Sequence, residues 1–235
     1  MRKITLVLAT AALAACGQSQ DTGISSLEND EQSASYAIGY RTGQQMEGQT
    51  EDLHLEAFIA GLRAGAGGST DLLMPEEEMD EALMSYQQRQ YQKMQDEMAS
   101  RGAVNREAGD QFRAENAERD EVTTLDNGLQ YEVLESGDGE ANPTLDDTVR
   151  AHYHGTLVDG TVFDSSVERG EPATFPLAHV IEGWQEALQL MSVGDKWRIV
   201  IPPDMAYGDQ EAGGRIPPGS TLIFDVELLE IGVEE

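Results

Sequence analysis

Apolar positions in the first half of the chain recur with helical spacing. Four of them are spaced i, i+3, i+4 and i+7 and so share one helix face: Leu55, Phe58, Ile59 and Leu62. The glycine cluster at 65–68 ends this helix. Ahead of it, Asn29 followed by Gln32 is typical of a helix start and predicts a short helix that continues to Met46.

A third and longer helix is predicted from Pro75 to about Arg119. Proline at a first helical position, followed by three glutamates, favours a helix start because acidic side chains stabilise the positive end of the helix dipole. Large side chains recur every seven residues in its first half: Met84, Tyr91 and Met98. Beyond that point the apolar stripe thins, so the second half is predicted to cross solvent as a stalk that bends at Gly102 and Gly109.

Three small helices bury little apolar surface by themselves. We therefore expect residues 27–74 and the first half of the long helix to be completed by a second copy, which makes the protein a homodimer. Methionine suits such a surface because its flexible side chain fills irregular gaps. The alternative is that the methionine and tyrosine stripe forms a core within one chain.

The second half of the chain has the alternating pattern of strands. Strands are expected at 129–133, 149–157, 197–201 and 222–229, and one short helix is expected at 183–190. Asp159-Gly160 between apolar flanks is a hairpin signal. The fold class is therefore α+β: an all-α N-terminal part, a long helix, and an antiparallel sheet wrapped on a short helix over residues 120–235.

The start of the chain has the pattern of an export signal. Two basic residues precede an apolar run that is too short to span a bilayer, which predicts a signal peptide over residues 1–15. The run ends in LAAC and resembles a bacterial lipobox, so Cys16 is expected to carry lipid, with 16–26 as a polar tether. Gly17 in the next position favours an outer-membrane address. The alternative is an ordinary signal peptide, with Cys16 incidental.

Charge and cysteine content exclude several functions. The 235 residues include 44 acidic and 15 basic side chains and carry a formal charge of −29, which would repel nucleic acid. The single cysteine excludes a disulfide framework and a cysteine zinc site. His152 and His154 alternate on a strand, and two ligands do not make a zinc site. We expect no metal and no cofactor.

Several short motifs in residues 121–235 resemble those of FKBP-type peptidyl-prolyl isomerases. They are HY at 152–153, DGTVFDSS at 159–166, VIEGW at 180–184, AYG at 206–208, IPP at 216–218 and LIFDVEL at 222–228. The lipobox, the helical N-terminal part and the GLQY junction at 128–131 are similar to the macrophage infectivity potentiator branch. That resemblance implies a V-shaped dimer with a helical dimerisation module at 27–74. It also implies a long connecting helix at 75–119, whose first half belongs to that module, and an isomerase domain at 120–235.

The resemblance also implies which residues form the site. The expected pocket is lined by Tyr153, Phe163, Val180, Ile181, Trp184, Tyr207 and Phe224. Trp184 would be its floor, and the Ile181 backbone N–H and the Tyr207 hydroxyl would donate hydrogen bonds to substrate carbonyls. Asp164 would contact the twisting amide or orient its neighbours, with Arg169 as its partner; the alternative for Asp164 is a turn cap.

Two positions depart from the small single-domain members of the family. Ala173 stands where those members often have an aromatic wall, and the loop 211–215 carries Arg215 but no aromatic side chain. A thinner and more polar wall is therefore expected. Macrolide inhibitors are candidate ligands, and these departures bear on their affinity and on the preference for the residue before proline.

The predicted function is a prolyl isomerase that assists the folding of exported proteins in the bacterial envelope. Its substrates would be proline-containing unfolded or extended polypeptides, and its lipid anchor would hold it at the outer membrane, facing the periplasm or the cell surface. The alternative is a dimeric envelope holdase chaperone, or a surface interaction protein, with weak isomerase activity. The intact set of pocket residues favours the enzyme.

Overall fold

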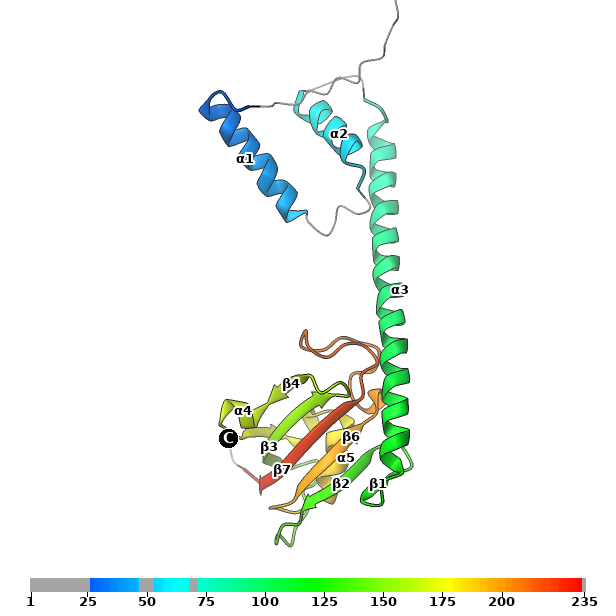
Figure 1. Ribbon diagram of the computed structural model, residues 1–235, viewed down its shortest axis with the longest axis vertical. Helices are drawn as coiled ribbons and strands as arrows, with labels where there is room; N and C mark the ends of the chain where they lie inside the picture. Colours follow the sequence, from blue (N-terminus) through cyan, green and yellow to red (C-terminus); the bar gives the residue numbers. More distant parts are fainter. Residues whose placement is uncertain (1–25, 47–52, 68–71, 234–235) are drawn as a thin grey trace, which may run out of the picture. The chain divides into compact units, whose positions relative to one another are not determined.

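The structure is a computed structural model that describes residues 26–46, 53–67 and 72–233. The predicted signal peptide and Cys16 lie outside these residues. The chain forms two compact units that meet in sequence between Pro75 and Glu76 (Figure 1). Among the described helices, none combines the length and the apolar character that crossing a membrane requires.

The first unit contains two helices, α1 (Asp30–Gln45) and α2 (Leu55–Gly67). The Asn29 side chain caps α1 by accepting a hydrogen bond from the Gln32 backbone N–H at 2.8 Å. The Gln32 side chain in turn accepts from the Glu28 N–H at 2.7 Å, so two free donors at the helix start are satisfied. Neither helix buries a residue in the single chain.

The second unit begins with the long helix α3 (Glu76–Ala117), which starts directly after Pro75. In its first half four large apolar side chains are exposed, among them Met84 at 61% and Tyr91 at 60%. In its second half Gly102 and Gly109 are buried. The helix therefore has two parts with different surroundings.

The prediction that the second half of α3 crosses solvent as a stalk is wrong for 102–116. Seven residues spaced i, i+3, i+4 and i+7 on one face are buried or half-buried: Gly102, Asn105, Arg106, Gly109, Phe112, Arg113 and Asn116. Figure 1 shows this part of α3 running alongside the sheet. The contact carries little apolar signal because it is built from glycine and hydrogen-bonding side chains.

Hydrogen bonds join this part of α3 to the sheet. The Gln130 side chain is almost fully buried; it donates to the Arg113 carbonyl at 2.8 Å and accepts from Asn116 Nδ2 at 2.9 Å. Gly109 lies so close to Thr221 that a Cβ in its place would be 2.2 Å from the Thr221 hydroxyl oxygen. The glycines predicted to bend a stalk are thus the positions where the helix comes close to the domain.

Seven strands within residues 72–233 form one antiparallel sheet in the order β1-β2-β6-β7-β3-β4, with β5 also paired to β3. The long strands are β2 (Gln130–Glu135), β3 (Thr148–Leu157), β6 (Lys196–Ile201) and β7 (Leu222–Ile231). The short ones are β1 (Val122–Thr124), β4 (Val162–Ser165) and β5 (Ala173–Pro176). Asp159-Gly160 forms the predicted turn between β3 and β4, where Gly160 has φ +84°.

The sheet wraps around the short helix α5 (Glu182–Leu190), which buries Trp184, Ala187 and Leu188 against it. Three one-turn elements complete the unit: α4 (Ser166–Arg169), η1 (Leu177–His179) and η2 (Pro203–Met205). The alternation predicted for β3 is observed, because Val149, Ala151 and Tyr153 face the core and their neighbours face outward. The predicted α+β fold class is confirmed.

Candidate active site

A cavity of about 730 Å³ opens between α5, the inner face of the sheet and the loop that precedes β7. Eight of the residues expected at the site line it: Tyr153, Phe163, Asp164, Val180, Ile181, Trp184, Tyr207 and Phe224. The expected partner of Asp164, Arg169, lies next to the cavity in α4. Cys16 lies outside the described residues.

Aromatic rings form the inner surface of this cavity. The Trp184 ring meets Tyr153 and Phe224 edge to face, with ring centroids 5.4 and 5.3 Å apart. Phe163 meets Phe224 in the same way at 5.3 Å. Gly155 permits this packing, since a Cβ there would be 2.7 Å from the Phe163 ring. Edge-to-face contacts favour one orientation of each ring, so the inner surface of the cavity is apolar and closely packed.

Among the hydrogen-bond donors that line this cavity and have no partner in the described residues, two match the donors expected from the sequence. One is the backbone N–H of Ile181, at the N-terminal boundary of α5. The other is the hydroxyl of Tyr207, whose side chain is 43% exposed. Free donors beside an apolar floor can bind the carbonyl groups of an extended peptide while its apolar side chain fills the cavity.

Asp164 belongs to a hydrogen-bonded cluster at the edge of the cavity. The Tyr153 hydroxyl donates to Asp164 Oδ2 at 2.5 Å, and Arg169 donates to Asp164 Oδ1 and, at 2.8 Å, to the Tyr153 hydroxyl. Burial raises the pKa of Asp164, but the hydrogen bonds from Tyr153 and Arg169 outweigh it and hold that pKa below its ordinary value. Burial and the Asp164 hydrogen bond raise the pKa of Tyr153. The carboxylate is therefore ionised and oriented by two donors.

Ala173 is not among the residues that line the cavity, and the thinner wall at this position stays a prediction. Phe175, two residues further along β5, lines the cavity, with its ring centroid 5.6 Å from Trp184 and 5.9 Å from Tyr153. Strand alternation, which places residues 173 and 175 on one face, was the signal that could have identified it. His179 also lines the cavity and was not among the residues expected there. Its place immediately before Val180 was the signal that could have identified it.

The wall on the other side comes from the loop that precedes β7. Tyr207, Ala212, Gly213, Arg215 and Ile216 line the cavity there. As expected, residues 211–215 contribute no aromatic ring. Arg215 Nη1 reaches the Phe163 carbonyl at 3.4 Å, so its guanidinium lies at the cavity edge.

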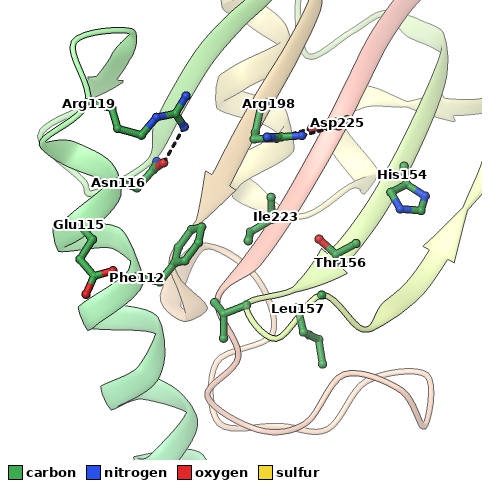
Figure 2. A pocket seen from close by; sticks show the side chains of 12 residues that line it. Phe112, Glu115, Asn116, Arg119, His154, Thr156, Leu157, Arg198, Ile223 and Asp225 are labelled. Carbon is green, nitrogen blue, oxygen red and sulfur yellow. Dashed lines mark hydrogen bonds and ion pairs between the residues drawn. The ribbon is translucent and has the colours of Figure 1, made fainter.

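A second cavity, of about 590 Å³, lies on the outer face of the sheet beside the end of α3 (Figure 2). Its two arginines are already paired. Arg198 makes two hydrogen bonds to Asp225, at 2.7 and 2.8 Å, and Arg119 pairs with Glu132 at 2.8 Å. The charges in this cavity neutralise one another, so we assign it no ligand.

Across the described ranges, no three histidine, cysteine, aspartate or glutamate side chains gather closely enough to hold a metal ion. His152 and His154 instead hydrogen-bond through Nδ1 to the hydroxyls of Ser166 and Ser165, each at 3.0 Å.

Two sequence families match the chain. Residues 139–229 match the family described as FKBP-type peptidyl-prolyl cis-trans isomerase. Residues 31–133 match the domain amino terminal to FKBP-type peptidyl-prolyl isomerase. The two matches together span most of the described residues.

Individual proteins are similar over nearly the whole chain. The FKBP-type 22 kDa peptidyl-prolyl cis-trans isomerase of Escherichia coli K12 is 46% identical over 86% of this chain and 95% of its own length. The outer membrane protein MIP of Legionella longbeachae is 39% identical over 89% of each chain. The crystal structure of FkpA from Escherichia coli superimposes with a TM-score of 0.73 at 38% identity, covering 88% of this chain and 99% of that one.

Proposed function

The chain belongs to the FKBP-type peptidyl-prolyl cis-trans isomerases, and we propose that it isomerises prolyl bonds in the aromatic cavity floored by Trp184. The observation that carries this proposal is the pairing of an apolar floor with the free donors of Ile181 and Tyr207. Prolyl isomerisation makes and breaks no covalent bond, so it needs a shaped pocket and directed hydrogen bonds.

The barrier in the reaction is the partial double bond of the amide, about 18–20 kcal/mol in water. Twisting the amide removes its resonance and makes its carbonyl less polar. Moving the peptide from water into a dry aromatic cavity therefore penalises the planar ground state more than the twisted transition state. The proline ring would lie on Trp184, while the Ile181 N–H and the Tyr207 hydroxyl hold the flanking carbonyls.

Asp164 has a positioning role in this mechanism. Its carboxylate accepts from both Tyr153 and Arg169, and the Arg169 guanidinium lies 5.5 Å from the centre of the Tyr153 ring. The cluster holds the Tyr153 ring against Trp184 and keeps a negative charge at the edge of the cavity, where it orients the twisting amide. The turn-cap role at this point falls instead to Ser165, whose hydroxyl accepts from the Glu168 N–H.

The substrates are proline-containing unfolded or extended polypeptides, and the setting is the bacterial envelope. The lipobox-like LAAC run supports export and lipid attachment at Cys16, and the Legionella relative is called an outer membrane protein. Replacing Cys16 by alanine should release the protein from membranes washed with high salt. Retention of that variant would contradict the anchor.

A homodimer formed through the helices accounts for their exposed apolar side chains. In α1, Tyr36 and Ile38 are 64% and 68% exposed, and α2 exposes Leu55 and Leu62. Neither helix buries a residue in the single chain, and covering these side chains with a second copy would remove apolar surface from water. If the protein is monomeric, the same surface favours the alternative of a holdase for unfolded chains.

The test of the site is isomerisation of a proline peptide by full-length variants. Phe163→Ala should lower kcat/KM because it lets water into the cavity, and Tyr207→Phe should lower it through the loss of one hydroxyl. Tyr131→Phe is the matched control, since Tyr131 stacks on Trp197 outside the cavity. Wild-type activity in both pocket variants, with folding verified by circular dichroism, would place the reaction elsewhere. The aromatic cavity also makes macrolides candidate inhibitors, to be tested in the same assay.

A further inference from the structure

One wall of the cavity is carried by the long loop 202–219. It contributes Tyr207, Arg215 and Ile216 to the site, and apart from the short helix η2 and an isolated bridge it has no regular secondary structure. The Tyr207 hydroxyl makes no hydrogen bond of its own among the described residues. The position of this side chain therefore depends on what holds the loop backbone.

Arg106 of α3 holds the loop on both sides of Tyr207. Its Nη2 donates to Asp204 at 2.8 Å, and its Nε donates to Asp209 at 2.8 Å. The arginine is 98 and 103 residues away from these aspartates in sequence. Its two hydrogen bonds raise the pKa of the guanidinium, and the bond to Asp204 lowers the pKa of that carboxyl group, so the Arg106–Asp204 pair is charged over the whole neutral range.

The other end of the loop also contacts α3. Asn105 Nδ2 donates to the Pro218 carbonyl at 2.8 Å. Gly219, with φ +71°, lies so close to Gly102 that a Cβ would be 2.3 Å from the Gly102 carbonyl oxygen. The Gly219 N–H donates to the Gly208 carbonyl at 2.8 Å and so joins the end of the loop to the residue that follows Tyr207. One turn of α3 thus fixes both ends of the segment that carries Tyr207.

We propose that Arg106 is a positioning residue for the isomerase, acting through the loop 202–219 to hold the Tyr207 hydroxyl where it meets the substrate carbonyl. This inference rests on the proposed function, because it requires Tyr207 to act on substrate. A donor that is held in place before the substrate binds loses less freedom in the transition state than a mobile one. The long helix is then part of the catalytic unit as well as a connection to the N-terminal helices.

The first measurement is kcat/KM of full-length Arg106→Gln on a proline peptide. We expect a fall of about threefold to tenfold, in the range expected for the loss of two partly exposed charged hydrogen bonds. The double variant Asp204→Asn/Asp209→Asn removes the partners of Arg106 on the loop and should lower kcat/KM by the same factor. It replaces Arg106→Gln in the test if that variant folds poorly. Arg101→Gln is the matched control, since Arg101 is an exposed arginine of α3 outside the face that contacts the domain. This variant should retain wild-type kcat/KM.

The second measurement separates positioning from general destabilisation. Tyr207→Phe is made in the wild-type and in the Arg106→Gln background. If Arg106 acts through Tyr207, the hydroxyl contributes less to catalysis once Arg106 no longer holds the loop. The effects of Tyr207→Phe and Arg106→Gln on the free energy derived from kcat/KM are then less than additive. Additive effects, or wild-type kcat/KM in both Arg106→Gln and the double aspartate variant, would overturn the inference.

Failure of this inference is distinguishable from failure of the proposed function. If Phe163→Ala and Tyr207→Phe lower kcat/KM while Arg106→Gln does not, the site stands and the positioning role is wrong. If Phe163→Ala lowers it but Tyr207→Phe does not, the cavity stands and Arg106 has no hydroxyl to position. If neither pocket variant lowers it, the site itself is wrong.

Discussion

At the scale of single residues, Arg215 differs from the other basic side chains of residues 121–233. Each of the other four pairs with a carboxylate: Arg150, Arg169, Lys196 and Arg198. For Arg215 the structure shows only the bond to the Phe163 carbonyl, and its guanidinium lies at the edge of the cavity. A cation without a carboxylate partner at the entrance to a pocket can bind an anionic group of the substrate.

We therefore expect the enzyme to tolerate an acidic residue before proline. Arg215→Gln should lower kcat/KM for a peptide with glutamate before proline by about twofold to fivefold, the range of an exposed ion pair. The peptide with glutamine at that position should be unaffected, and raising the salt should remove the difference between the two enzymes. An unchanged ratio of the two peptides would contradict the role of Arg215.

The second prediction at this scale concerns Asp164 and pH. Its pKa is lower in the folded protein than in the unfolded chain, so its ionised form stabilises the fold above the unfolded pKa, about 3.9. That contribution is lost as the pH falls through the lower, folded value. The difference in unfolding free energy between wild type and Asp164→Asn should be constant from about pH 8 to pH 5 and should shrink below about pH 4. A difference that changes between pH 5 and pH 8 would mean that the Tyr153 and Arg169 contacts are not maintained in solution.

At the scale of elements, the contact of α3 with the sheet depends on how closely the helix can approach. Gly109→Ala would place a Cβ 2.2 Å from the Thr221 hydroxyl oxygen, so the helix or the end of the loop before β7 must move. We expect this variant to lower the free energy of unfolding by about 1–3 kcal/mol, the usual cost of overpacking. Thermal or urea unfolding measures it.

Gly102→Ala is the matched control on the same face of α3. Its Cβ would be 3.7 Å from the Pro218 Cβ, which is an ordinary contact, and alanine favours a helix by about 1 kcal/mol over glycine. It should therefore be neutral or stabilising. Equal effects of the two variants would show that helix propensity, not close packing, governs this contact.

At the scale of the whole molecule, the proposed homodimer would cover the exposed methionine and tyrosine side chains of α3. Met84→Glu should raise the dissociation constant of the proposed dimer by about a hundredfold or more, because it buries a charge without a partner. Met84→Leu keeps the apolar side chain and should leave the dimer intact. Sedimentation or light scattering measures both, and a wild-type monomer would contradict the dimer and favour the holdase alternative.

Much of the site could be predicted because its residues stand in short, ordered motifs. The motifs around Tyr153, Phe163, Trp184, Tyr207 and Phe224 contain eight residues that line the cavity. Periodicity located α1, α2 and the four long strands. The Asn29 and Gln32 pair identified the start of α1 for a local reason, since a helix cap involves residues within one turn. The division of the chain at residue 120 and the chemical roles of the site residues stay predictions.

Sequence by itself therefore determined the features that depend on local spacing: the helix starts, the strand alternation and the pocket motifs. Tertiary structure alone decided that 102–116 packs on the domain and that Arg106 holds a loop about a hundred residues away. The physical reason is that periodicity reveals only faces buried by large apolar side chains. A face made of two glycines, two asparagines, two arginines and a single phenylalanine has nearly the composition of a solvated helix. Only the positions of its distant partners distinguish the two.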